Sequence, residues 1–153
     1  MDKEVIYHFD SPEESSGYLL WQVTMAWQRA MKRSLDELDI THTQFVLLAA
    51  LGWLAKENSE VSQVDIALHS NTDRMMVSKV LRTLEEKKLV VRKDHPTDTR
   101  AKIVNLTRLG QDLLQKALVV VKEVDDAFFK VLGPYRGVVD LNLKTLLNEN
   151  PIK

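Results

Sequence analysis

The spacing of apolar residues along the chain predicts a mainly helical protein. In most of the chain these residues recur at steps of three or four, which is the period of one buried face of an α-helix. Capping residues mark several helix starts, at Ser11-Pro12-Glu13-Glu14, Thr41-His42-Thr43-Gln44 and Ser62-Gln63-Val64-Asp65. We therefore expect helices over residues 11–38, 41–57, 63–68, 74–88, 107–132 and 135–148.

Two short segments interrupt the helical pattern. Residues 89–93 and 101–106 have the apolar, β-branched composition of strands, and the polar residues 94–100 lie between them as a turn. Upstream, the polar cluster at 69–73 predicts a tight turn that ends in a new helix cap. The order short helix, tight turn, amphipathic helix and hairpin is typical of a winged helix-turn-helix.

The length of the chain and its surplus of apolar surface predict one domain that dimerises. We expect residues 1–153 to form a single domain, with a winged helix-turn-helix core at about 41–106 and dimerisation helices at about 11–38 and 107–149. The first helix carries apolar residues on more than one side, and a partner subunit is a natural cover for the second side. The predicted fold class is therefore mainly α with a small β-hairpin wing, in a homodimer.

Charge is distributed unevenly along the chain, although the net charge is only −1. Residues 73–108 contain ten basic and five acidic side chains, a local charge of +5, whereas the rest of the chain carries −6. Such asymmetry is expected when one segment faces the phosphates of double-stranded DNA. A solvated surface with unevenly placed charges is the alternative interpretation.

Composition argues against several other classes of protein. There is no cysteine, and the four histidines lack the paired spacing of a metal site. The sequence shows no glycine-rich phosphate loop and no nucleophile elbow, so we expect no metal, no cofactor and no enzymatic activity. The first ten residues lack a signal pattern and no apolar run is long enough to span a membrane, which predicts a cytoplasmic protein with no membrane partner.

The candidate DNA contacts fall on the second helix of the motif and on the wing. A recognition helix reads base edges with its outward side chains, while a wing contacts phosphates or the minor groove. Asp98 is expected to hold the guanidinium of Arg100 by a charge-assisted hydrogen bond. The remaining candidates are Asn71, Thr72, Arg74, Met75, Ser78, Lys79 and Arg82 on the helix side, and Arg92, Lys93, His95, Thr97, Arg100 and Lys102 on the wing.

Two motifs resemble the MarR family, the multiple-antibiotic-resistance-type regulators. Asp98-Thr99-Arg100 followed by Leu106-Thr107-Arg108-Leu109-Gly110 is similar to that family's wing signature, and the resemblance extends over nearly the whole chain. It implies a triangular dimer that binds a pseudo-palindromic operator. Such a dimer commonly represses transcription until a small molecule or other signal weakens its binding to DNA. The chain departs from the pattern at Lys88, where glycine is usual, which predicts a differently shaped turn. It also departs at Met75 and Met76, where small hydroxyl residues are usual, so one of the two methionines could meet a thymine methyl group.

The resemblance also implies a site for a small aromatic effector. Trp21, Met25, Phe45 and Trp53 are the candidates to line an apolar cavity between the first two helices and the long fifth helix. Packing in the core and the dimer interface is the alternative, because aromatic residues at helical spacing usually serve that purpose.

Taken together, the patterns predict a sequence-specific DNA-binding transcriptional regulator, a ligand-responsive repressor that binds a pseudo-palindromic operator as a homodimer. The alternative is a winged-helix protein-protein interaction module that does not bind DNA. The acidic net charge and the two methionines of the recognition helix keep this alternative open.

Overall fold

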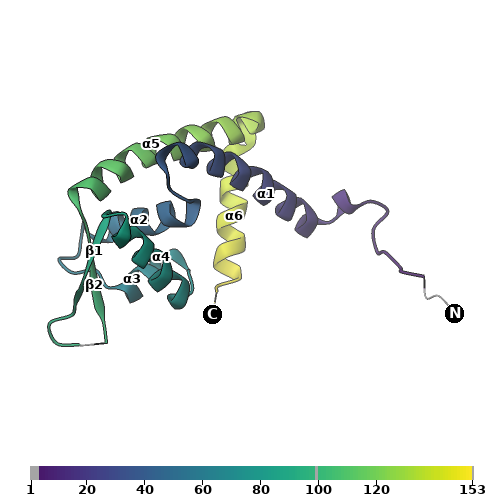
Figure 1. Cartoon of the computed structure of the whole chain (residues 1–153). Helices are drawn as coiled ribbons and strands as arrows, with labels where there is room; N and C mark the ends of the chain where they lie inside the picture. The colour runs from purple at the N-terminus through teal and green to yellow at the C-terminus, as the bar shows by residue number, and fades with distance from the viewer. Residues whose placement is uncertain (1–3, 99, 153) are drawn as a thin grey trace.

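The computed structural model describes residues 4–98 and 100–152, which form a mainly helical molecule with one antiparallel hairpin (Figure 1). The winged helix-turn-helix class predicted from the sequence is confirmed. Short 3₁₀ segments at Pro12–Glu14, Asp36–Leu38 and Lys130–Tyr135 connect some of the elements. In chain order the elements are α1 (Ser16–Leu35), α2 (His42–Leu54), α3 (Gln63–Ser70), α4 (Arg74–Glu86), β1 (Val90–Asp94), β2 (Lys102–Leu106), α5 (Arg108–Phe129) and α6 (Arg136–Glu149).

Side-chain caps explain where three of the helices begin. The Thr41 hydroxyl accepts the N–H of Gln44, whose side chain accepts the N–H of Thr41 in return, both at 3.1 Å. Ser62 and Asp65 form the same reciprocal box at the start of α3. Thr107 accepts the N–H of Gly110 at 3.0 Å and so caps α5. These local bonds satisfy N–H groups that have no partner within the helix.

The first helix starts later than predicted. The segment beginning at Ser11 opens only the 3₁₀ turn Pro12–Glu14, and α1 begins at Ser16. Ser15 adopts an extended conformation and its hydroxyl accepts the N–H of Tyr18 at 3.3 Å, so Ser15 is the N-cap of α1. Serine favours such caps over helix interiors because its hydroxyl bonds to nearby backbone groups.

A compact core lies beneath α2, α4 and the hairpin. Its fully buried side chains include Leu47, Leu48, Leu81 and Leu84, and α5 closes the core with Leu114. The strands pair from Val90↔Leu106 to Asp94↔Lys102. The base of the hairpin is also bonded to the segment before α3, because the N–H of Val104 donates to the Val61 carbonyl at 2.8 Å. This bond fixes the wing relative to the helix-turn-helix.

The turn between α4 and β1 keeps a left-handed residue although no glycine is present. Lys88 has φ of +61°, a conformation that favours glycine. Bonds on both sides hold it there: the Leu89 N–H donates to the Leu84 carbonyl at 2.9 Å, and the Thr107 hydroxyl donates to the Lys88 carbonyl at 2.7 Å. Lysine thus adopts a left-handed conformation at this position, and a turn shaped differently from that of glycine-containing relatives stays a prediction.

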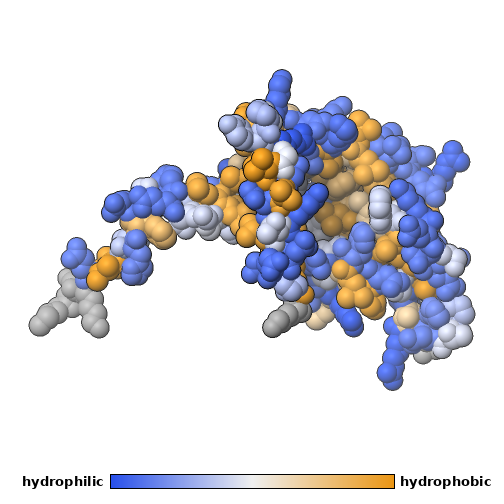
Figure 2. All heavy atoms as spheres, turned by 180° about the vertical axis from the view of Figure 1, so that it is seen from behind, coloured by the Kyte–Doolittle hydropathy of each residue, from blue (hydrophilic) through white to orange (hydrophobic). Residues whose placement is uncertain are grey.

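Two parts of the chain extend away from this core. Figure 1 shows α5 running along one side with α1 beside it, α6 descending from its far end, and the N-terminal segment projecting beyond α6. No residue of α6 is buried, and apolar side chains are visible along α6 and the projecting arm in Figure 2. The exposed apolar residues of these parts include Tyr18, Leu20, Trp21, Val138, Leu141, Leu146 and Leu147. No helix within the described ranges is both long and apolar enough to cross a membrane.

Candidate nucleic-acid interface

The tight turn between α3 and α4 has the geometry predicted from its polar residues. Asn71 ends α3 in the left-handed conformation, with φ of +50°. Asp73 then caps α4, because its carboxylate accepts the N–H groups of Met75 at 2.9 Å and Met76 at 3.0 Å. The turn therefore fixes the angle between the two helices and presents the first turn of α4 outward.

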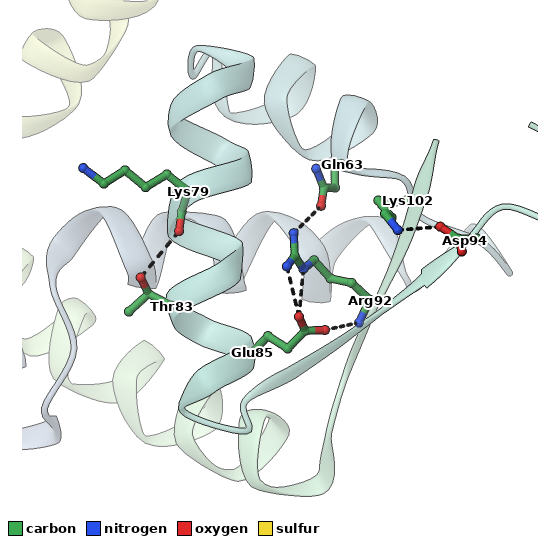
Figure 3. A network of polar contacts seen from close by, with 7 residues as sticks. All are labelled: Gln63, Lys79, Thr83, Glu85, Arg92, Asp94 and Lys102. Carbon is green, nitrogen blue, oxygen red and sulfur yellow. Dashed lines mark hydrogen bonds and ion pairs between the residues drawn. The ribbon is translucent and has the colours of Figure 1, made fainter. Parts of the chain in front are cut away.

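Helix α4 has one buried face and one exposed polar face. Val77, Leu81 and Leu84 are fully buried against the core. Residues 75, 78, 79 and 82 lie on the opposite side by helical spacing. The structure leaves Asn71, Arg74, Met75, Lys79 and Arg82 exposed and Thr72 and Ser78 half-buried. Figure 3 shows the Lys79 side chain pointing away from the axis of α4, on the side opposite Arg92.

Arg92 differs from the other predicted DNA contacts. Its guanidinium lies 3.0 Å from the Glu85 carboxylate and donates to the Gln63 side chain at 3.2 Å, and only 16% of its side chain is exposed (Figure 3). It therefore joins β1 to α4 and α3, and its charge is paired within the protein. A DNA contact by Arg92 stays a prediction, and its pairing with Glu85 argues for a structural role.

The wing tip is shaped by side chains that bond to the local backbone. His95 accepts the N–H groups of Thr97 at 3.2 Å and Asp98 at 3.1 Å through Nδ1, and its Nε2 lies 3.7 Å from the Glu60 carboxylate. Asp98 accepts the backbone N–H of Arg100 at 3.0 Å. The predicted bond from Asp98 to the Arg100 guanidinium is thus replaced by a bond to the main chain, because this contact closes the turn. Thr99 of the wing motif lies outside the described residues.

Three further cations of the wing have different surroundings. Lys102 forms an ion pair with Asp94, its partner in the strand register (Figure 3). Lys93 and Arg100 are exposed. Within the described part of the chain, Lys93, Arg100 and the α4 residues Arg74, Lys79 and Arg82 form no ion pair. These five unneutralised cations, on α4 and the wing, define a basic face.

A polar and aromatic contact that the sequence analysis missed joins α1, α2 and α5. The Trp27 Nε1–H donates to the Asp125 carboxylate at 2.8 Å, and the His42 ring lies 5.0 Å from the Trp27 ring in an edge-on arrangement. Burial lowers the pKa of His42, while the nearby Asp125 charge acts in the opposite direction. The residues of this contact are separated by up to 98 positions, so no local pattern could reveal it.

The four predicted effector residues are divided between different parts of the described structure. Phe45 and Trp53 border a hollow of about 290 Å³ between α2 and the end of α3. Trp53 also borders a larger hollow, of about 510 Å³, between α2, β2 and α5. Trp21 is exposed on the projecting part of α1 and Met25 is half-buried, and neither lines these hollows. An effector site that uses all four residues stays a prediction, and neither of these two hollows supplies it.

The larger hollow has a mixed lining. Its floor is apolar, with the buried residues Leu51, Val104 and Leu114, and its rim carries exposed amide side chains such as Asn105 and Gln111. Lys56 is its one charged lining residue, and the ammonium group lies 4.3 Å from the centre of the Trp53 ring. In the described ranges, no group of three histidine, aspartate or glutamate side chains is placed to hold a metal ion.

Comparisons with known proteins agree with this geometry. Residues 36–125 match the family model described as the ArnR1-like winged-helix domain. The chain is 42% identical over 121 residues to the uncharacterized HTH-type transcriptional regulator YdcH of Bacillus subtilis, an alignment that covers 79% of this chain and 82% of YdcH.

Two solved structures extend the comparison to the whole fold. The MepR-DNA complex of Staphylococcus aureus superimposes with a TM-score of 0.80 at 27% identity, covering 89% of this chain and 98% of MepR. BpsR of Bordetella bronchiseptica, whose DNA binding is regulated by 6-hydroxynicotinic acid, superimposes with a TM-score of 0.79 at 25% identity, covering 95% and 99% of the two chains. The chain therefore belongs to the MarR family of winged-helix transcriptional regulators.

Proposed function

We propose that this protein represses transcription by binding a pseudo-palindromic DNA operator as a homodimer. The observation that carries the proposal is the basic face, whose cations on α4 and the wing have no carboxylate partner in the described structure. Helix α4 would enter the major groove with its exposed side, while Arg100 and Lys93 follow the adjacent backbone or minor groove. The similarity to MepR, solved in complex with DNA, supports this docking.

A homodimer would account for the apolar surface that one subunit leaves uncovered. Helix α6 has no buried residue, and Leu141 and Trp21 are each more than half exposed. Pairing of α1 and α6 with their counterparts would cover these side chains and set the distance between two α4 helices. That distance must match one helical turn of DNA, about 34 Å, or a multiple of it.

The salt dependence of DNA binding tests the proposal directly. Duplexes selected from a random pool should bind with an affinity that falls steeply as salt rises, because phosphate contacts release counterions. If Lys79 contacts one phosphate per subunit, Lys79→Ala should reduce the slope of log K against log salt by about 1.8 for the dimer. Lys116→Ala on the exposed side of α5 is the matched control and should leave the slope unchanged. Absence of binding to any duplex at low salt would favour the interaction module instead.

We further propose that an effector binds the larger hollow beside Trp53. The ring and the apolar floor suit a planar molecule, and Lys56, which is the one charge of the lining, suits an anionic group. A ligand there would touch α2, the base of the wing and α5 together. It could therefore change the spacing of the two DNA-binding faces, provided that it binds one spacing more tightly than the other.

Release of DNA by small aromatic acids tests this site. We would titrate benzoate, nicotinate, 6-hydroxynicotinate and 4-hydroxycinnamate against the protein-duplex complex and follow anisotropy of labelled DNA. Release that persists in Lys116→Ala, an exposed position of α5 outside the hollow, but is lost in Trp53→Ala would support the site. Release that is insensitive to Trp53 would contradict it.

We also infer that the protein acts in the cytoplasm and catalyses no reaction of its own, consistent with a family of regulators.

A further inference from the structure

Met75 is an apolar side chain placed where a helix of this kind offers polar groups. It is the second residue of α4 and its side chain is 82% exposed, whereas the neighbouring Val77 is fully buried. By helical spacing it heads the stripe that continues through Ser78, Lys79 and Arg82. The rest of the subunit covers little of the Met75 side chain, so this side chain contacts either solvent or a bound partner.

The first turn of α4 holds this residue in a fixed position. The Asp73 carboxylate accepts the N–H groups of both Met75 and Met76, so these two donors of the first helical turn have a partner. Met76 is 50% exposed and points about 100° around the helix from Met75, towards the half-buried side of Val80 and Thr83. The two methionines therefore differ in direction although they share one helical turn.

The charges around Met75 indicate what kind of surface it meets. Arg74, Lys79 and Arg82 are all exposed beside it, and these cations favour a polyanion over an apolar protein surface. In the major groove of DNA the main apolar group is the C5-methyl group of thymine, and residues near the start of a recognition helix are those that reach base edges.

We propose that Met75 determines part of the DNA sequence preference by contacting a pyrimidine C5-methyl group, that of thymine in unmodified DNA, in each half-site. This inference rests on the proposed function and specifies the base that one side chain reads. The unbranched thioether suits the contact because it is flexible and polarisable and can fit against a small methyl group.

Replacement of thymine by deoxyuridine provides the test, because the two bases differ only by this methyl group. In a duplex selected from a random pool, thymines would be replaced one position at a time, in both half-sites together. Loss of one buried methyl group corresponds to about fourfold in affinity, and so to about 16-fold for two half-sites. We expect a loss of that size at one position of the half-site in the wild-type protein.

Two variants assign the effect to the residue. Met75→Ala should bind the thymine and deoxyuridine duplexes equally, whereas Met76→Ala should keep the discrimination of the wild type. Thermal unfolding of both variants should match the wild type, since the substituted side chains are exposed. A further duplex pair with cytosine or 5-methylcytosine at the sensitive position separates the methyl group from the rest of the base, and the methylated duplex should bind more tightly.

The outcomes separate this inference from the proposed function. If the wild type binds duplex DNA but no deoxyuridine position lowers affinity, or if Met75→Ala keeps the discrimination, the reading by Met75 is overturned and the DNA-binding function stands. If the wild type binds no duplex at any salt concentration, both are overturned.

Discussion

The Glu85 carboxylate receives three hydrogen bonds from Arg92, two from the guanidinium at 3.2 and 3.0 Å and one from the backbone N–H at 2.9 Å (Figure 3). Glu85 lies in the last turn of α4 and Arg92 lies in β1. The pair therefore joins α4 to the wing, the two elements proposed to contact DNA together.

Removal of this link should destabilise the fold and loosen the wing. Arg92→Ala leaves the Glu85 carboxylate without its side-chain donors and should lower the free energy of unfolding by about 1–2 kcal/mol. Lys93→Ala, at the exposed neighbouring position of β1, should change it by less than about 0.5 kcal/mol. Urea unfolding measures both changes. Equal stabilities of the two variants would contradict a structural role for Arg92.

The same pair predicts a dependence of stability on pH. The hydrogen bonds from Arg92 lower the pKa of Glu85 below its ordinary value of 4.5. The carboxylate therefore loses its proton more readily in the folded protein than in the unfolded chain. The resulting stabilisation is complete above pH 4.5, and it is lost as the pH falls through the lower pKa that Glu85 has in the folded protein. The stability difference between wild type and Glu85→Gln should shrink on acidification from neutral pH to about pH 3.5. In an Arg92→Ala background this pH dependence should be much smaller, and a dependence that persists unchanged would assign it to another group.

Lys88→Gly should stabilise the protein. Lysine pays a steric cost in the left-handed conformation that glycine avoids, and the substitution should raise the free energy of unfolding by about 0.5–1 kcal/mol. Arg82→Gly, at an exposed position in the interior of α4, should lower it by a similar amount, about 0.5–1 kcal/mol. Thermal unfolding of the two variants gives the comparison. A decrease for Lys88→Gly would mean that the lysine side chain makes a stabilising contact that outweighs the backbone strain.

The dimer interface can be tested with two tryptophans of equal exposure. Trp21 on α1 and Trp53 on α2 are each 61% exposed in one subunit. If α1 pairs with a second copy, Trp21→Glu places a charge in a desolvated interface and should shift the molecular mass from dimer to monomer. Trp53→Glu should leave the dimer intact. Sedimentation equilibrium measures both masses, and a dimer that tolerates Trp21→Glu as well as Trp53→Glu would place the interface elsewhere.

Much of the secondary structure could be predicted because its signals are local. The capping boxes at Thr41 and Ser62 involve residues three positions apart, and the structure forms both. The turn at Asn71 and the cap at Asp73 depend on short polar side chains next to their own backbone. The predicted start of α1 was too early: Ser11 and Ser15 both adopt an extended conformation, but only the Ser15 side chain accepts a backbone N–H.

Spatial relationships between distant residues could not be obtained in this way. Gly110 was noted as part of a motif, but the structure shows its reason: a Cβ atom there would lie 1.9 Å from the Leu89 carbonyl oxygen. The bond between Trp27 and Asp125, and the separation of Trp21 from Trp53, likewise depend on how α1, α2 and α5 pack.

The sequence by itself determined the order and type of the elements, since periodicity, capping and turn chemistry act over a few neighbouring residues. The tertiary structure decided which of the many cations remain unpaired. Arg92 and Arg100 look alike in sequence, yet one is neutralised by Glu85 and the other is exposed at the wing. The physical reason is that an ion pair is set by distance in space, and packing of the whole chain fixes that distance.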